Sequence, residues 1–406
     1  MLTNYLSLLL LFLSLSATTP LTSLSPSQLP RRCRLTLLCG TSEPKKVVII
    51  GGGFAGLYTC KALSEKGPYD VTMISPSPRF TFSPLLYELA TGDREIDDVS
   101  PTLNSVLPTG TAHLEASAES VSFPTRTVAC RDASGSLKTV SYDYLVIGSG
   151  LRSGLSNPTP DCSNFSTVED ALNLRRRISY LQTLPAAVRV AVVGGGYSGV
   201  EVALCVKKTM PTAEVTILQR SGAVLPAAKG SNRELAVEAL IGAGVEVVGG
   251  VEVESVEGGG VTRADGGVVK ADQIIWTAAT DAKIGVDLGS VAGPDDRGVQ
   301  TDECLRVVDK VKGKAYRNVF ALGDVAAVEG RESRPNAQVA MAQAGCVALN
   351  IGADERGERP VAFGMVELGE MLTLGETGAV AGPGGIKIGG RLGRAVRSAV
   401  YDVRKP

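Results

Sequence analysis

Two stretches of the chain repeat one pattern of apolar run, glycine turn and mixed segment. Apolar runs at 47–50 and 190–193 are each long enough for a buried strand, and each leads into G-x-G-x-x-G. The glycines are Gly51, Gly53 and Gly56 in the first copy and Gly194, Gly196 and Gly199 in the second. A strand, this spacing and a helix predict a turn that holds a dinucleotide pyrophosphate at the helix N-terminus. Two copies therefore predict two bound dinucleotides.

The remaining hydrophobic pattern extends this to an α/β fold with two Rossmann-like dinucleotide-binding domains, the second inserted in the first. Helices are expected at 55–65 and 169–181, and strands at 71–74, 118–123, 127–131, 142–148, 245–256, 267–270, 273–276 and 319–322. The stretches 118–123 and 127–131 alternate as antiparallel strands do. The expected divisions are a presequence at 1–44, a first domain at 45–158 and 285–363, an inserted domain at 159–284, and a C-terminal hairpin with a basic helix at 364–406.

A third signature indicates which dinucleotide each domain takes. The apolar run 319–322 delivers Gly323 and Asp324 to a strand end, where ligands bind in open α/β sheets. There Asp324 would accept hydrogen bonds from the ribityl hydroxyls of FAD, although an Asp at this position can also cap the next helix. We therefore expect FAD in the first domain and NADPH or NADH in the inserted one, an arrangement suited to hydride transfer.

Composition removes several other classes of function. The 406 residues carry a net charge of −1, which gives no bulk attraction to nucleic acid. Eight cysteines without C-x-x-C spacing and one histidine, His113, favour neither a metal site nor a disulfide framework. No internal apolar stretch reaches the 18–20 residues of a membrane span. Cys60 stands alone after the first glycine turn, which excludes disulfide reductase chemistry.

Four segments carry a resemblance to a known family: Pro84–Gly92, Ile275–Ala279, Ala337–Gln343 and Val366–Gly375. With the two glycine turns they are similar to the type II NAD(P)H:quinone oxidoreductases, in particular the plastid and cyanobacterial subgroup of these two-dinucleotide flavoproteins. The resemblance implies FAD-dependent oxidation of NAD(P)H with two-electron reduction of a membrane prenylquinone, plastoquinone-like, without proton pumping. A soluble NAD(P)H:acceptor reductase and a non-catalytic NAD(P)H-sensing flavoprotein are the alternatives.

The same resemblance implies three catalytic residues. Glu201 would lie near the stacked nicotinamide, Gln338 would hydrogen-bond a quinone carbonyl, and Gln343 belongs to the same Ala-Gln helix beside the flavin. The alternatives are that Glu201 is a first-turn glutamate stabilised by the helix dipole, and that Gln338 is an amide on a helix surface.

The ends of the second strands bear on nucleotide choice. Ser75 takes the place of the usual acid in the first domain, and Gln219-Arg220 takes it in the second. A missing carboxylate removes repulsion of a 2′-phosphate, and Arg220 would pair with it, so NADPH is expected beside NADH. The alternative is that Arg220 points to solvent.

The two ends of the chain predict location. Residues 1–42 lack Asp and Glu and join a short apolar run to an Arg- and Ser-containing segment, which favours bipartite targeting to a plastid; a secretory signal or a mitochondrial presequence is the alternative. Residues 391–405 fit a helix with one apolar and one basic face, which predicts a surface of a membrane or plastoglobule. A helix packed on the protein body is the alternative, and a homodimer is a further expectation. The apolar face holds Leu392, Val396, Ala399 and Val403, and the basic face holds Arg391, Arg394, Arg397 and Arg404.

Overall fold

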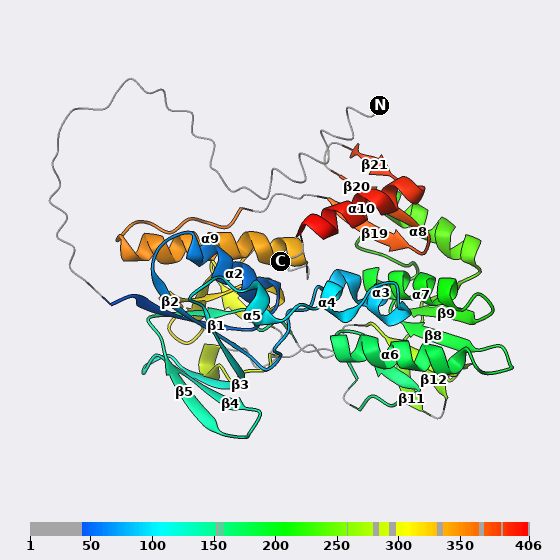
Figure 1. Ribbon diagram of the computed structural model, residues 1–406, viewed down its shortest axis with the longest axis horizontal. Coiled ribbons are helices and arrows are strands. Elements are labelled where there is room, and N and C mark those ends of the chain that lie inside the picture. Colours follow the sequence, from blue (N-terminus) through cyan, green and yellow to red (C-terminus); the bar gives the residue numbers. More distant parts are fainter. Residues whose placement is uncertain are drawn as a thin grey trace.

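The computed structural model describes residues 43–151, 154–155, 157–257, 259–278, 284–291, 298–330, 336–364, 369–382 and 385–404. They form two α/β lobes and a smaller C-terminal unit (Figure 1). All but the last two residues of the expected presequence lie outside the described part of the chain.

The first lobe is built on a sheet with the strand order β18-β15-β16-β17-β6-β1-β2-β3-β4-β5. At its centre β17, β6, β1 and β2 run parallel. In β1, residues 47–50 are at most 3% exposed, as expected of a parallel strand covered on both faces. Helices α2 (Phe54–Ser64) and α9 (Ala337–Glu355) pack against each other beside this sheet (Figure 1). The strands are β1 (Lys45–Ile50), β2 (Tyr69–Ser75), β3 (Ala112–Ser122), β4 (Thr127–Asp132), β5 (Leu137–Ser141), β6 (Tyr144–Ile147), β15 (Val299–Thr301), β16 (Arg306–Asp309), β17 (Lys314–Ala321) and β18 (Ala326–Val328).

The second lobe lies between β6 and β15 in sequence, so the predicted insertion of one domain in the other is confirmed. Its main sheet has the order β10-β9-β8-β14-β7, and every pairing in it is parallel. A separate antiparallel sheet holds β11, β12 and β13. The elements are β7 (Cys162–Asn164), α6 (Val168–Leu181), β8 (Arg189–Val193), α7 (Tyr197–Thr209), β9 (Glu214–Gln219), α8 (Gly230–Ala243), β10 (Glu246–Gly249), β11 (Val253–Glu257), β12 (Gly260–Arg263), β13 (Val268–Lys270) and β14 (Gln273–Trp276).

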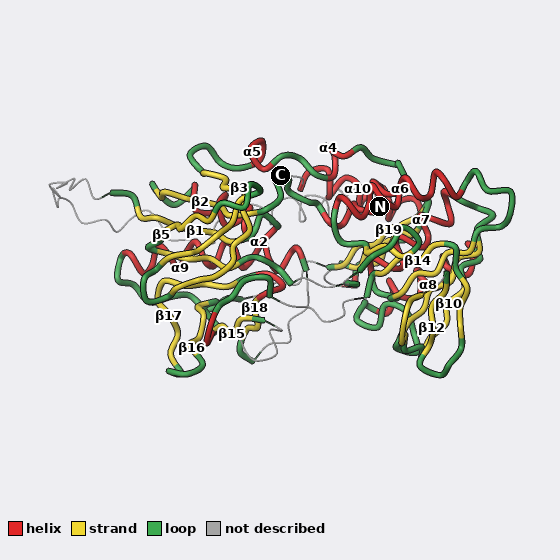
Figure 2. The backbone as a smooth tube through the Cα atoms, turned by 90° about the horizontal axis from the view of Figure 1, so that it is seen from below, coloured by secondary structure: helices red, strands yellow, loops and turns green. Residues whose placement is uncertain are grey.

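A segment of short helices joins the two lobes: α3 (Leu86–Thr91), α4 (Ile96–Val99) and α5 (Leu103–Val106). In Figure 2, α5 lies beside the first lobe and α4 lies between the lobes. Helix α3 packs against α6 and α7 of the second lobe. One hydrophobic cluster contains Leu57 of α2, Leu89 of α3 and Val202 of α7, so the lobes share a core through this segment. Single 3-10 turns, η1 (Ser83–Leu85), η2 (Gly289–Val291) and η3 (Gly323–Val325), complete the connections.

The C-terminal unit is an antiparallel sheet, β19 (Glu370–Leu374), β20 (Thr377–Ala381) and β21 (Lys387–Ile388), with α10 (Gly390–Arg404) laid on it. It packs on α7 and α8 of the second lobe (Figure 1). The contact between α10 and β20 is backbone on backbone, since a Cβ at Gly393 would lie 2.5 Å from the carbonyl oxygen of Gly378. The C-terminal helix therefore belongs to the protein body.

Candidate functional site

The first glycine turn joins β1 to α2 and has one open position. A Cβ on Gly51 would lie 2.3 Å from the Gly148 carbonyl oxygen, and one on Gly56 would lie 1.9 Å from the Gly51 carbonyl oxygen. A Cβ on Gly53 would meet nothing within 4 Å. Two glycines thus allow close backbone packing, while Gly53 leaves free space at the N-terminus of α2. A pyrophosphate site requires this combination of close backbone packing at two glycines and open space at the glycine between them.

The second glycine turn, between β8 and α7, repeats this geometry. A Cβ on Gly199 would lie 1.8 Å from the Gly194 carbonyl oxygen, whereas one on Gly196 would again meet nothing within 4 Å. The two turns are also held alike, because Gly51 N donates to Ile74 O and Gly194 N to Leu218 O, both at 2.9 Å. We call these two turns the first and second cradle. Both lie at the carboxyl ends of parallel strands, where α/β sheets bind ligands.

The third signature lies beside the first cradle. A Cβ on Gly323 would be 3.2 Å from Cβ of Ala55, next to Gly56. The buried side chain of Gln343, on α9, accepts a hydrogen bond from Gly323 N at 2.7 Å. Gln338 is half-buried in the first turn of α9, and its backbone N donates to the capping side chain of Asn336 at 2.8 Å. The structure therefore brings the first cradle, Gly323 and the Ala-Gln helix together.

Asp324 is exposed at this strand end, where the backbone N–H of Asn336 donates to it. Partial desolvation by the surrounding protein raises its pKa, and the Asn336 hydrogen bond opposes that rise. The carboxylate is thus at the N-terminus of α9 and accessible to the hydroxyls of a ligand.

The two polar residues at the end of β9 differ in their contacts. Oε1 of Gln219 accepts from Gly195 N at 2.6 Å, and Nε2 donates to Ser221 Oγ at 2.6 Å, so this amide is fixed against the second cradle. Arg220 is exposed, and its guanidinium bonds to none of the described residues. At the matching end of β2, Ser75 is buried, and its Oγ would lie 2.7 Å from a Cβ on Gly52.

Glu201, two residues after the last glycine of the second cradle, is buried in an ionic cluster. Its Oε1 accepts from Thr373 N at 2.9 Å and from Arg397 Nη2 at 3.1 Å. Burial raises the pKa of Glu201 to about 7, although Arg397 and the Thr373 amide both lower it. This carboxylate can therefore gain or lose a proton near neutral pH.

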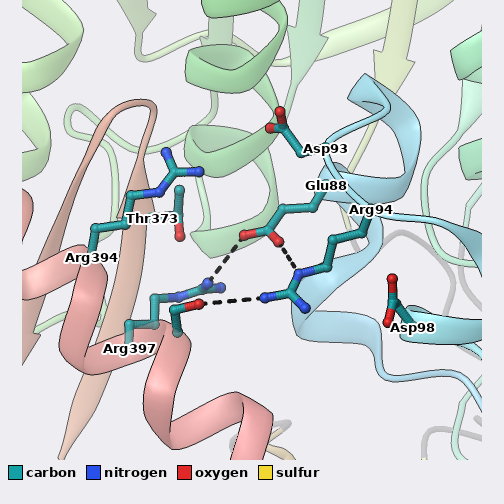
Figure 3. Close-up of a pocket in the computed structure, with 8 residues that line it drawn as sticks. Glu88, Asp93, Arg94, Asp98, Thr373, Arg394 and Arg397 are labelled. Atoms are coloured by element: carbon teal, nitrogen blue, oxygen red, sulfur yellow. Dashed lines mark hydrogen bonds and ion pairs between the residues drawn. The ribbon is translucent and has the colours of Figure 1, made fainter.

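A second acid, Glu88 of α3, completes the cluster. Its Oε2 pairs with Arg94 Nε at 2.5 Å, and its Oε1 lies 3.8 Å from Arg397 Nη1. Figure 3 shows Arg94 and Arg397 directed toward Glu88 from opposite sides of a polar pocket of about 320 Å³. Glu88, Arg94 and Thr373 were not predicted as site residues from the sequence. For Glu88 the available signal was an acid within the mostly apolar stretch 86–91. The pocket is lined by Glu88, Asp93, Arg94, Asp98, Thr373, Arg394, Arg397 and Ser398.

The expected division of faces on the C-terminal helix is wrong. Arg397, assigned to the outward basic face, is 2% exposed, and Leu392, assigned to the apolar face, is 48% exposed. The buried face contains Gly393, Arg397 and Val400. Close contact with β20 at Gly393 sets this face, and Arg397 is drawn inward by two acids. Val403 and Arg404 fall where the side chains are outside the described part.

Comparison with known proteins gives the family. Residues 45–344 match the family model described as pyridine nucleotide-disulphide oxidoreductase. The chain belongs to this family. It is 30% identical to demethylphylloquinone reductase NdbB of Synechocystis sp., over 90% of this chain and 93% of that protein. It is 29% identical to the alternative NAD(P)H-ubiquinone oxidoreductase C1, chloroplastic/mitochondrial, of Arabidopsis thaliana, over 89% of this chain and 78% of that protein.

The solved structures agree in fold. NDH2 of Plasmodium falciparum in complex with NADH superposes with a TM-score of 0.75 at 18% identity, covering 88% of this chain and 94% of that one. The predicted two-domain Rossmann-like fold and the resemblance to type II NAD(P)H:quinone oxidoreductases are confirmed. Among the described residues, no helix is both long and apolar enough to cross a membrane. No three His, Cys, Asp or Glu side chains in that part of the chain gather as metal ligands would.

Proposed function

We propose that this protein binds FAD in the first cradle, oxidises NAD(P)H bound in the second, and reduces a membrane prenylquinone by two electrons. The observation that carries the proposal is the matched pair of cradles, each with one open glycine, on two lobes with a shared core. The quinone is inferred from the relatives, two of which are named as reductases of demethylphylloquinone and of ubiquinone. The proposed domains are 45–158 and 285–363 for FAD, 159–284 for NAD(P)H and 364–406 for the C-terminal unit.

The residues present fit FAD. Space beside Gly53 and the N-terminus of α2 would receive the pyrophosphate, and Asp324 would accept from ribityl hydroxyls. A bound flavin would supply the redox chemistry between NAD(P)H and the quinone. The protein's role is to hold the two cradles in a fixed position relative to each other. Gln343 fixes the Gly323 turn, and Gln338, half-buried and near the same strand end, would donate a hydrogen bond to a quinone carbonyl.

NADPH is the proposed donor beside NADH. The side-chain amide of Gln219 accepts a hydrogen bond from Gly195 N, as the carboxylate of an acid at this position could. Unlike a carboxylate, the amide brings no negative charge. The adjacent guanidinium of Arg220 bonds to no described residue and would pair with a 2′-phosphate.

Glu201 is proposed to act on the nicotinamide side as a buried carboxylate whose protonation varies near neutrality. The raised pKa, to about 7, supports this role, because such a group can release or accept a proton during turnover. Its ionic contact with Arg397 means that it acts from within a fixed cluster rather than from an open cleft.

Attachment to a lipid surface is proposed through the outward side of the C-terminal unit. Lys387, Arg391, Leu392 and Ala395 are exposed there, combining two positive charges with apolar side chains. Each such cation contributes about 1 kcal/mol at an anionic membrane. Liposome flotation should show binding at low salt that the double variant Lys387→Glu/Arg391→Glu loses; equal flotation of both would contradict this surface.

We also propose a plastid location, supported by the acid-free composition of 1–42 and by a chloroplastic relative. A fluorescent fusion of residues 1–44 tests it, with mitochondrial targeting as the contrary result. Sedimentation of the purified protein tests the expected homodimer.

One assay separates the proposal from its alternatives. The purified chain is given NADPH or NADH, with and without a water-soluble short-chain quinone. Turnover that depends on quinone supports the proposal. Turnover with ferricyanide but none with any quinone would indicate a soluble acceptor reductase. Flavin reduction without turnover would indicate a sensing flavoprotein.

A further inference from the structure

Arg397 is a buried cation whose partners come from separate parts of the chain. It is 2% exposed, and its Nη2 lies 2.9 Å from Pro84 O and 3.1 Å from Glu201 Oε1. The rings of Tyr87 and Tyr401 lie 5.4 Å and 4.3 Å from its guanidinium carbon. A buried guanidinium keeps its pairs because leaving a charge unpaired is costly.

These contacts join the second cradle to the segment that extends from the first lobe. Glu201 lies on α7, whose N-terminus is the second cradle. Pro84, Tyr87 and Glu88 belong to η1 and α3, in the connection between β2 and β3 of the first lobe. Arg397 enters from α10, which is held on the C-terminal sheet by the close contact of Gly393 with Gly378. One side chain therefore ties together three parts of the molecule.

A line of aromatic contacts continues from Arg397 to the first cradle. Tyr401, stacked near the guanidinium, meets Phe82 with ring centroids 5.3 Å apart. Phe82 in turn meets Phe54 at 5.4 Å, and Phe54 directly follows Gly53. Helix α10 is thus linked to α7, which follows the second cradle, by an ion pair, and to α2, which follows the first cradle, by a chain of three rings.

We propose that Arg397 is a positioning residue that fixes the second cradle relative to the first, and so aligns the nicotinamide with the flavin. The inference rests on the proposed function. Hydride transfer depends steeply on such alignment, since a displacement of about 1 Å can cost about 100-fold in rate. Glu88 keeps Arg94 if Arg397 is removed, whereas among the described residues Glu201 keeps the Thr373 amide alone. The groups that face Glu201 are then Tyr87, Glu88 and Cys205.

The test uses FAD-loaded, full-length protein as wild type, Arg397→Met and Arg397→Lys. Arg356→Met is the matched control, since this exposed arginine forms its ion pair with Glu358 across a turn. Stopped-flow absorbance measures flavin reduction by NADPH without oxygen, and the long-wavelength charge-transfer band between reduced flavin and NADP⁺ reports stacking. We expect Arg397→Met to retain FAD, to reduce flavin about 100-fold more slowly and to lose the band. Arg397→Lys should recover at least about tenfold of that rate, and the control should match wild type.

The double variant Glu201→Gln/Arg397→Met covers the case in which the single variant fails to fold, because it leaves no unpaired acid at Glu201. A folded, FAD-loaded variant of either kind with the wild-type reduction rate and an intact band would overturn the inference alone. Wild-type flavin that neither NADPH nor NADH reduces would overturn the proposed function, and the inference with it.

Discussion

The two cradles share a backbone and differ in the side chains around it. Each has a blocked third glycine and an open second glycine, and each is tied to the neighbouring strand by the same hydrogen bond at 2.9 Å. Two residues past the third glycine, however, the first has Tyr58, which stacks on Phe54, and the second has the buried Glu201. At the end of the second strand, Ser75 in one matches Gln219 in the other.

This difference separates what holds a dinucleotide from what selects it. Close packing of strand on helix dictates the glycines, so both cradles must have them. The side chains beside them are free to diverge, and they have diverged toward aromatic packing in one lobe and an ionic cluster in the other.

The largest expected effect tests the shared backbone. Gly56→Val and Gly199→Val would each place a Cβ within 2 Å of a carbonyl oxygen, at 1.9 Å and 1.8 Å. We expect each to lower the free energy of unfolding by more than about 3 kcal/mol. Gly53→Ala and Gly196→Ala, which meet no atom within 4 Å, should change it by less than about 1 kcal/mol. Urea unfolding of the four variants measures these changes. Wild-type stability of either Gly56→Val or Gly199→Val would contradict the close packing of these glycines.

The next effect separates Glu201 from its counterpart Tyr58. Burial raises the pKa of Glu201 from 4.5 to about 7, so its ionised form is disfavoured in the folded state. The protonated side chain therefore makes its full contribution to the free energy of unfolding below about pH 4.5. That contribution falls by roughly 3 kcal/mol as the pH rises to about 7. Glu201→Gln should therefore gain stability relative to wild type across this range and then level off. Urea midpoints from pH 4.5 to 8 measure the gain, and Tyr58→Phe should run parallel to wild type; a flat difference for Glu201→Gln would contradict its buried titration.

A smaller change should affect only the first cradle. Asp324→Asn removes the charge-assisted acceptor that we propose for the ribityl hydroxyls, an interaction worth about 2 kcal/mol. The Kd for FAD, measured by flavin fluorescence, should rise about 30-fold. The Kd for NADPH should not change. An equal loss for both ligands would mean that Asp324 supports the fold rather than the flavin.

The smallest predicted effect concerns only the second cradle. Gln219→Glu keeps the acceptor for Gly195 N but adds a charge facing the site proposed for the 2′-phosphate. It should shift the ratio of kcat/KM for NADPH and NADH toward NADH by about tenfold, or about 1.4 kcal/mol. Arg220→Gln should move the ratio in the same direction. Steady-state kinetics with both nucleotides decides, and an unchanged ratio in both variants would assign nucleotide choice to other residues.

The cradles were predictable from the sequence because their geometry is local. Gly51, Gly53 and Gly56 lie within six residues, and the strand and helix that flank them are short, strongly patterned elements. Gly323 and Asp324 likewise directly follow a strongly patterned buried strand. Gln343, which lies 20 residues after Gly323 on α9 and accepts from its backbone N, was expected only from the family resemblance.

The ionic cluster was not predictable in this way. Glu88 and Arg397 are more than 300 positions apart in sequence, and neither position alone indicates a partner. The hydrophobic pattern of α10 also misleads, because the face that packs on β20 begins with Gly393, a residue that carries no apolar side chain. The apolar stripe is consequently turned by about a quarter of the helix circumference from the buried face.

The most direct test of the account is a paired substitution at the two open glycines. Gly53→Val and Gly196→Val both place side chains in the spaces proposed for pyrophosphates, and a Cβ there meets no protein atom within 4 Å. Each variant is purified, its FAD content is read from absorbance, and its Kd for NADPH is measured by titration. The account predicts that Gly53→Val is folded and colourless, and that Gly196→Val retains FAD but binds no NADPH. Full flavin retention in Gly53→Val, or flavin loss confined to Gly196→Val, would contradict the assignment of the two cradles.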